Sequence, residues 1–380
     1  MASENSGKHR FSVLDSWRGI AALMVVLYHL RLGGIWSNVP LFRNGYLFVD
    51  FFFVLSGFVM ACQYENKLSN GLPILTFMKL RFSRIYPLHL AVLLAFLVRQ
   101  GVSGLSETAA RGEVTAYSWQ SFISNVFLLQ GMGIHHELTW NGPSWSISVE
   151  FYTYLVFGLV LLAAHKGRLW IYGLAAVTSA FAIAKLSPSY IDTTYQFGFL
   201  RAIYGFFCGA IVWAVYSKIH KSAKISTSPN IRSAILEISI VMVMLWFVCL
   251  AGKSWLNMFA PIMFSAVVLI FAFEAGIVST TLKSRVFLKA GLYSYSVYLI
   301  HVLLLSLMRM TFRFVDKHLG TQLISNKMVD GAAQYVFGGN SAYAAIEILF
   351  ILCVLMIIAS QTYRYIEVPG QRFLRDRLGV

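Results

Sequence analysis

An arginine and a histidine lie eleven residues apart in the first long apolar segment of the chain, at Arg18 and His29. Eleven residues of α-helix turn through about 1100°, close to three full turns, and rise roughly 16 Å. The two side chains therefore share one helix face at different depths. A guanidinium binds anionic groups and a neutral histidine is the commonest general base near pH 7. The pair would suit a reaction whose donor and acceptor arrive from opposite ends of the helix.

Both residues also have a structural interpretation. His29 could be a polar packing residue that is hydrogen-bonded to a neighbour, and Arg18 could extend its head group to the nearer membrane surface. An ionisable side chain inside an apolar segment costs about 3 kcal/mol or more unless it faces a cavity or a partner. We therefore keep both residues as site candidates.

Three more ionisable residues, Asp50, Glu150 and Arg201, stand near the outer ends of apolar segments. A carboxylate beside His29 would hold its ring in the correct tautomer and stabilise the imidazolium, and Glu150 is the deeper of the two acids. Alternatively, Glu150 and Arg201 form an ion pair between helices. The sequence leaves both interpretations open.

At the opposite, inner end, Arg81 and Arg84 lie three residues apart, on adjacent surface positions of a helix. Arginine forks bind phosphate oxygens in a bidentate manner, which suits a phosphorylated donor. The alternative is ordinary positive charge at a membrane surface.

The remaining titratable groups are interpreted as structural. His301 lies among aromatic and hydroxyl side chains, the His-His-Glu run at 135–137 has no other ligand cluster nearby, and the four cysteines show no paired spacing. No metal site is therefore predicted.

The bilayer is the expected solvent of this chain. Of its 380 residues, 58% are hydrophobic and 12% are charged, whereas soluble domains carry about 25% charged residues. Apolar runs long enough to span a membrane predict an all-α bundle of about ten transmembrane helices, near 12–32, 46–64, 84–100, 145–164, 169–186, 196–217, 233–251, 256–276, 291–312 and 342–363.

An even number of spans puts both termini on the same side of the membrane. The tails and loops on that side carry about twice as many Lys and Arg residues as the loops on the other side, and such an excess marks the cytoplasmic side. This predicts that both termini are cytoplasmic, with short tails at 1–11 and 364–380 flanking a single membrane domain over 1–380. The net charge of +15 is explained by helix ends beside anionic headgroups rather than by nucleic acid. The stretch from Trp119 to Met132 is too short to span and predicts a re-entrant or interfacial helix.

Seven segments in order resemble the acyltransferase-3 family of integral membrane acyltransferases, whose members O-acetylate lipopolysaccharide, exopolysaccharide and Nod-factor sugars. They are LDSWRGIAALMVVLYHL at 14–30, VDFFFVLSGFVM at 49–60, RFSRIYPLHL at 81–90, PSWSISVEFYTYL at 143–155, FLRAIYGFFCGA at 199–210, YSYSVYLIH at 293–301 and YRYIEVPGQRFLR at 363–375. Many relatives have proline in place of Tyr204, and some append a hydrolase-like domain.

The resemblance implies that Arg18 and His29 are the family's signature pair, and that Arg81 and Arg84 bind the donor. It further implies a bacterial inner membrane, acetyl-coenzyme A as co-substrate with no tightly bound cofactor, and a carbohydrate hydroxyl as acceptor, with polysaccharide-assembly proteins as further partners.

The acceptor is expected to approach past Asp50, Trp145 and Arg201, although interface anchoring is an alternative reading for a tryptophan. An oxyanion would be stabilised by backbone amides of 54–57 or by the hydroxyls of Ser146 and Ser148.

Three rival functions remain from the sequence. Intramembrane Arg, Glu and His also mark the substrate path of a transporter or flippase, although no inverted repeat is evident. The second rival is an acyltransferase with a non-carbohydrate acceptor, and the third is a non-catalytic subunit of a polysaccharide secretion machine.

Overall fold

The computed structural model describes residues 10–102, 116–164, 166–222, 231–329, 332–338 and 344–380. Within them, ten helices are long and apolar enough to cross a membrane. In lipid every backbone N–H and C=O must be satisfied within the segment, so a spanning apolar run folds as a helix. The prediction of an all-α bundle of about ten spans is confirmed, whereas the side faced by the termini stays a prediction.

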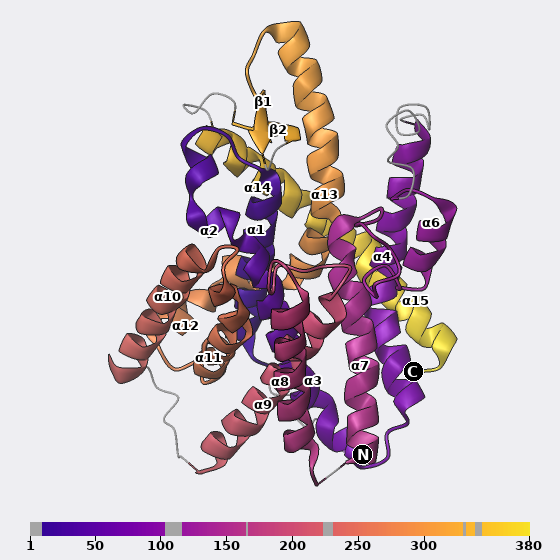
Figure 1. The fold of residues 1–380 in the computed structure, drawn as a ribbon, viewed down its shortest axis with the longest axis vertical. Coiled ribbons are helices and arrows are strands. Elements are labelled where there is room, and N and C mark those ends of the chain that lie inside the picture. Colours follow the sequence, from indigo (N-terminus) through magenta and orange to yellow (C-terminus); the bar gives the residue numbers. More distant parts are fainter. Residues whose placement is uncertain (1–9, 103–115, 165, 223–230, 330–331, 339–343) are drawn as a thin grey trace.

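The long helices fill most of the molecule (Figure 1). Their bounds are α1 Ser12–Leu30, α3 Phe48–Ser69, α4 Ile74–Val102, α7 Trp145–Ala163, α8 Arg168–Leu186, α9 Gly198–Ser222, α10 Ile231–Ala251, α11 Ala260–Ala272, α13 Arg285–Leu319 and α14 Ala344–Thr362. The short elements between them are α2 Pro40–Arg43, α6 Trp119–Val126, α12 Ile277–Leu282, α15 Val368–Leu378 and the strands β1 Ile324–Val329 and β2 Ala332–Phe337. The predicted interfacial helix after Trp119 thus corresponds to α6.

Two helices extend well beyond their predicted bounds. Helix α4 begins at Ile74, ten residues before the predicted start, so Arg81 and Arg84 lie two to three turns inside it rather than at its first turn. Helix α13 has 35 residues, about 52 Å at 1.5 Å per residue. One end of α13 rises above the rest of the bundle (Figure 1).

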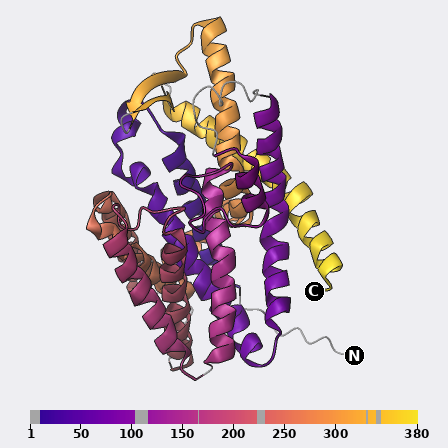
Figure 2. The ribbon, with the colours of Figure 1, turned by 45° about the vertical axis from the view of Figure 1, so that its right-hand side comes forward.

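The segment 364–380, expected to be a tail, is helical and packs against α4. Helix α15 runs beside α4 in both ribbon views (Figures 1 and 2). Lys79 of α4 donates a hydrogen bond of 3.1 Å to the carbonyl of Leu378, and a Cβ at Gly370 would lie 2.5 Å from Pro87 of α4. The end of the chain is therefore part of the helix bundle.

Glycines allow the central helices to approach closely. A Cβ at Gly57 of α3 would collide with the carbonyl oxygen of Phe206 on α9, and one at Gly209 of α9 would collide with that of Val54 on α3. The α1–α13 contact is similar, because a Cβ at Gly19 would lie 2.6 Å from the backbone of Ala290. Helices in lipid associate through such small residues, and this packing fixes α1 against α13.

The two strands form a hairpin beside the end of α1. β1 and β2 are antiparallel, and Phe337 of β2 exchanges backbone hydrogen bonds with the chain that follows α1. The Gly33 amide donates to the Phe337 carbonyl at 2.7 Å, and the Phe337 amide donates to the Arg31 carbonyl at 3.2 Å. The hairpin is thereby tied to the chain two residues after His29.

Candidate functional site

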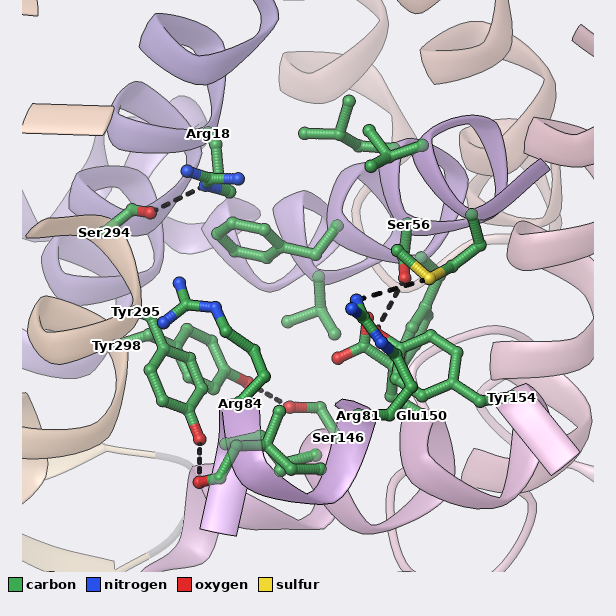
Figure 3. Close-up of a pocket in the computed structure, with 18 of the residues that line it drawn as sticks. Arg18, Ser56, Arg81, Arg84, Ser146, Glu150, Tyr154, Ser294, Tyr295 and Tyr298 are labelled. Carbon is green, nitrogen blue, oxygen red and sulfur yellow. Dashed lines mark hydrogen bonds between the residues drawn. The ribbon is translucent and has the colours of Figure 1, made fainter. Parts of the chain in front are cut away.

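A cavity of about 340 Å³ opens between α1, α3, α4, α7 and α13. Its polar lining comes from all five helices, and Figure 3 shows these side chains converging on one space. The polar lining residues are Arg18, Ser56, Gln63, Arg81, Arg84, Ser146, Glu150, Tyr154, Ser294, Tyr295 and Tyr298. The three arginines predicted to bind a donor are thus brought together, with Glu150 on the wall of the same cavity.

Arg18 points from α1 toward α13. Its Nε donates to the Ser294 hydroxyl at 2.9 Å and its Nη2 to the Gly291 carbonyl at 3.2 Å. Asp15, one turn earlier, lies 3.1 Å from the same Nη2. These contacts fix the guanidinium at the cavity wall.

Arg84 is held by Glu367, which follows α14 and is fully buried. The other carboxylate oxygen of Glu367 accepts a hydrogen bond of 2.6 Å from Ser296, and the Arg84 guanidinium lies 5.3 Å from the ring centroid of Tyr295. A paired arginine presents its remaining N–H groups in a fixed direction. Glu367 therefore orients Arg84.

Arg81 and Glu150 occupy the other side of the cavity. Arg81 donates to the Tyr64 hydroxyl at 2.7 Å, while its buried Nε has no hydrogen-bond partner among the described residues. Glu150 accepts a hydrogen bond of 2.6 Å from Tyr154, whose hydroxyl lies 3.0 Å from that of Ser56. The unsatisfied Nε leaves Arg81 with capacity for a further anionic or polar ligand.

His29 lies at the other end of α1 from Arg18 and does not line this cavity. Its Nδ1 is 2.9 Å from the carbonyl oxygen of Val25 and 3.3 Å from Nε2 of His301. Among the described residues, Glu150 is not one of its hydrogen-bond partners. The structure therefore places His301 of α13, rather than a carboxylate, against the ring of His29.

Tyr298 separates the cavity from the histidine pair. It lines the cavity, its ring centroid is 5.9 Å from that of His301, one turn further along α13, and 5.6 Å from that of Phe52. Its hydroxyl lies 2.7 Å from that of Ser146. Tyr298 therefore connects the cavity wall, including Phe52, to the histidine pair.

The three residues predicted on the acceptor side form one buried cluster. Arg201 donates to both carboxylate oxygens of Asp50, at 2.9 and 2.7 Å, and its remaining N–H groups bind the carbonyls of Thr193 and Tyr46, each at 3.1 Å. Its guanidinium lies 5.5 Å from the ring centroid of Trp145. The partner of Arg201 is thus Asp50, and the alternative pair of Arg201 with Glu150 is absent from the described residues.

Two of the proposed oxyanion donors are engaged elsewhere. The amides of 54–57 lie inside α3 and serve its helical hydrogen bonds. The Ser148 hydroxyl donates to the Leu128 carbonyl at 2.5 Å and accepts from the Gly131 amide. The third candidate, Ser146, lines the cavity, as do Leu55 and Ser56, and its hydroxyl donates to the Pro143 carbonyl at 3.0 Å.

No group of three or more His, Cys, Asp or Glu side chains in the described residues is arranged to hold a metal ion. In the 135–137 run, Nε2 of His135 lies 2.5 Å from the Ser124 hydroxyl. Burial lowers the pKa of His135, which favours its neutral form.

Sequence reasoning did not single out three residues that contact the site: Ser294, Ser296 and Glu367. All three lie inside the segments 293–301 and 363–375. A carboxylate within the apolar-flanked run YRYIEVPG was a signal that could have identified Glu367, whereas the two serines become recognisable only when α13 packs against α1 and α15.

Fold and site together define a polytopic membrane protein whose helices enclose an arginine-lined cavity. A family model described as an acyltransferase domain matches residues 11–364, and the chain belongs to this acyltransferase family.

Three curated relatives share parts of the chain. Protein 2 in the picA locus of Rhizobium radiobacter is 42% identical over 106 residues, which are 26% of this chain and 52% of that protein. Acyltransferase MdmB of Streptomyces mycarofaciens is 31% identical over 173 residues, 42% of each chain. Peptidoglycan O-acetyltransferase OatA of Listeria monocytogenes is 27% identical over 164 residues, 40% of this chain and 24% of that protein.

The alignments span about half or less of the length of these relatives. No solved structure matches the chain. The family match and the ten apolar helices in the described residues together indicate a multi-pass membrane protein of the acyltransferase family.

Proposed function

We propose that the chain transfers an acetyl group from cytoplasmic acetyl-coenzyme A to a hydroxyl of an extracytoplasmic carbohydrate, such as lipopolysaccharide O-antigen or exopolysaccharide, at a bacterial inner membrane. The observation that carries the proposal is the convergence of Arg18, Arg81 and Arg84 on one cavity inside the bundle. Coenzyme A is held there as a co-substrate rather than as a tightly bound cofactor.

The arginines supply the anion-binding side of the reaction. Arg84 is oriented by Glu367 and Arg18 by Ser294, while Arg81 keeps a buried Nε without a partner in the described residues. Charge-assisted hydrogen bonds from such groups to phosphate are about twice as strong as neutral ones. The phosphates of the donor bind here, and the pantetheine arm extends along α1 past Tyr298.

His29 is the base at the far end of this path. The rise of roughly 16 Å between Arg18 and His29 separates the phosphate site from the reacting thioester. His29 removes the proton of the acceptor hydroxyl as its oxygen attacks the thioester carbonyl. The C–S bond then breaks, and the coenzyme A thiolate receives the proton from the imidazolium.

Glu150 acts at the cavity rather than at the ring of His29. Its carboxylate lies within the electrostatic reach of Arg81 and Arg18 and is hydrogen-bonded to Tyr154. We assign it the role of spacing and orienting these guanidiniums.

A carbohydrate acceptor is supported by the similarity to OatA, which is a peptidoglycan O-acetyltransferase. The outer ends of α1 and α13, with the hairpin tied to Arg31 and Gly33, form the side from which the acceptor enters.

The test compares deletion cells that carry the wild-type gene, His29→Ala or the control His89→Ala, at matched protein levels in the membrane. Ester content of the surface polysaccharide is measured by mass spectrometry. We expect wild type and His89→Ala to restore one ester and His29→Ala to restore none. Restoration by His29→Ala would refute the role of His29.

Failure of all three genes would refute the carbohydrate acceptor. Uptake of labelled glycan without consumption of acetyl-coenzyme A would favour a transporter, and transfer of label to a small-molecule or lipid hydroxyl would favour a non-carbohydrate acceptor.

A further inference from the structure

His301 of α13 faces His29 of α1. His301 is fully buried, its Nε2 lies 3.3 Å from Nδ1 of His29, and the two ring centroids are 4.9 Å apart. The glycine contact between Gly19 and Ala290 holds α1 and α13 at this separation. The histidine pair is therefore fixed by backbone packing.

The proton of His301 can be assigned from its neighbours. Its Nδ1 lies 2.6 Å from the carbonyl oxygen of Tyr298. A carbonyl oxygen only accepts, so Nδ1 must carry the hydrogen. A neutral imidazole has one N–H, and Nε2 of His301 is consequently an acceptor.

The same argument applies to His29. Its Nδ1 lies 2.9 Å from the carbonyl oxygen of Val25, so this nitrogen also carries the hydrogen. That N–H is shared between the carbonyl of Val25 and Nε2 of His301. The remaining nitrogen of His29, Nε2, is left with a free lone pair.

We infer that His301 is a positioning residue that, together with the Val25 carbonyl, holds His29 in the tautomer whose Nε2 is free to take the acceptor proton. The inference rests on the proposed function of His29 as the base. His301 touches neither the thioester nor the hydroxyl, and it acts only through the ring of His29.

A neutral His301 suits the role of His29, because a general base must be uncharged before it accepts a proton. A carboxylate at 3.3 Å from Nδ1 would favour the imidazolium before the reaction begins, because an opposite charge stabilises the charged form. An imidazole acceptor fixes the tautomer without doing so. When Nε2 takes the hydroxyl proton, the Nδ1–H bond to His301 becomes charge-assisted and strengthens, so the stabilisation arises in the transition state.

The kinetic test uses three substitutions of His301 in protein reconstituted in nanodiscs. In His301→Gln the amide oxygen falls near the position of Nε2 and still accepts from His29. In His301→Asn the side chain is shorter, so its amide oxygen falls near the position of Nδ1 and cannot accept from His29. His301→Leu removes the acceptor altogether. The control is His89→Leu, which removes another buried histidine bound to a backbone carbonyl, that of Asn125.

We expect kcat with acetyl-coenzyme A to fall by about 100-fold in His301→Leu and His301→Asn, the lower range of acid–base contributions. His301→Gln is expected to lie within about tenfold of wild type, and KM for acetyl-coenzyme A to stay unchanged in all three. Equal loss in the Gln and Asn variants would overturn the inference, as would full kcat in either the Asn or the Leu variant. If the Leu variant does not fold, the Gln-to-Asn comparison decides.

A second readout does not depend on activity. In protein labelled with ¹⁵N-histidine, the His29 signals are assigned by their loss in His29→Gln. We expect Nδ1 protonated and Nε2 bare in wild type, and a mixture of the two tautomers in His301→Leu. A wild-type His29 protonated on Nε2 would refute the inference even if acyl transfer is observed, whereas the expected tautomer without any transfer would refute the proposed function alone.

Discussion

Asp50 and Arg201 form a buried ion pair between α3 and α9, with side chains that are 0% and 1% exposed. Arg201 donates four hydrogen bonds, two to the Asp50 carboxylate and two to backbone carbonyls. Gly57 and Gly209 bring the same two helices together. The pair therefore has the contacts of a structural ion pair that stabilises the packing of α3 against α9. A sugar could bind to Asp50 or Arg201 only by breaking these hydrogen bonds.

The first prediction is that single substitutions of this pair destabilise the protein far more than the double substitution. Removing one partner leaves an uncompensated buried charge, which costs about 3–5 kcal/mol, whereas replacing both with apolar residues is often neutral. We expect Asp50→Leu and Arg201→Met each to lower the free energy of unfolding by that amount, and the double variant to recover most of it. Thermal unfolding in detergent measures this difference.

The control for this cycle is Lys253→Met, because Lys253 is 68% exposed and lies 3.9 Å from Asp192. An exposed pair of this kind contributes at most about 1 kcal/mol. If instead the single variants of Asp50 and Arg201 are stable and lose only acceptor affinity, the pair belongs to the acceptor path as the sequence suggested.

The second prediction concerns donor affinity at Arg81. A hydrogen bond to a charged group contributes about 1.5–3 kcal/mol, so Arg81→Met is expected to raise the Kd of coenzyme A by about 10- to 100-fold. Because the phosphates are bound equally in the ground and transition states, KM should rise with little change in kcat. Calorimetry with coenzyme A and steady-state kinetics measure the two quantities.

Lys79→Met is the matched control for Arg81. Lys79 lies on the same helix, half a turn earlier, and binds the carbonyl of Leu378 rather than the cavity. An equal loss of affinity in both variants would mean that surface charge near α4, and not the cavity, attracts the donor.

The ten helices could be predicted from the sequence because hydropathy and the need to satisfy the backbone in lipid are local properties. The start of α4 could not, because Lys79, Arg81 and Arg84 lower the hydropathy of its first turns below that of a typical span. Their cost is offset by Leu378, Tyr64 and Glu367, which lie elsewhere in the chain.

The same distinction holds for the site. The spacing of Arg18 and His29 predicts a shared helix face, but not what faces it. His301 and Glu367 each meet their partners, His29 and Arg84, across more than 250 residues of sequence. Such pairings depend on which helices pack together, and a single sequence does not contain that information.

The third prediction fixes the sidedness of the membrane domain. Excess basic residues predict that the α3–α4 loop is cytoplasmic, and the β1–β2 hairpin lies at the opposite ends of the helices (Figure 2). In a background without the four native cysteines, Asn326→Cys should react with an impermeant maleimide added to intact spheroplasts. Asn70→Cys should react only after permeabilisation. The reverse pattern would mean that the α3–α4 loop is extracytoplasmic, which would contradict a cytoplasmic acetyl-coenzyme A donor.

The fourth prediction concerns Phe52, which lines the cavity and packs edge-on against Tyr298. Because Tyr298 also packs against His301, the proposed path brings the acyl group past the Phe52 ring on its way to His29. Phe52→Ala removes this restriction and creates room for a longer chain. Discrimination by one methylene in an apolar pocket is worth about 1–3 kcal/mol.

We therefore expect Phe52→Ala to raise the ratio of kcat/KM for butyryl- over acetyl-coenzyme A by about tenfold or more. The matched control is Phe181→Ala on α8, whose side chain is 64% exposed on the outside of the bundle and should leave the ratio unchanged. An unchanged ratio in Phe52→Ala, with normal folding, would show that the acyl group does not travel between Phe52 and Tyr298. His29 would then have to receive its substrate by another path, because the proposed one runs along the contacts of Tyr298 with Phe52 and with His301.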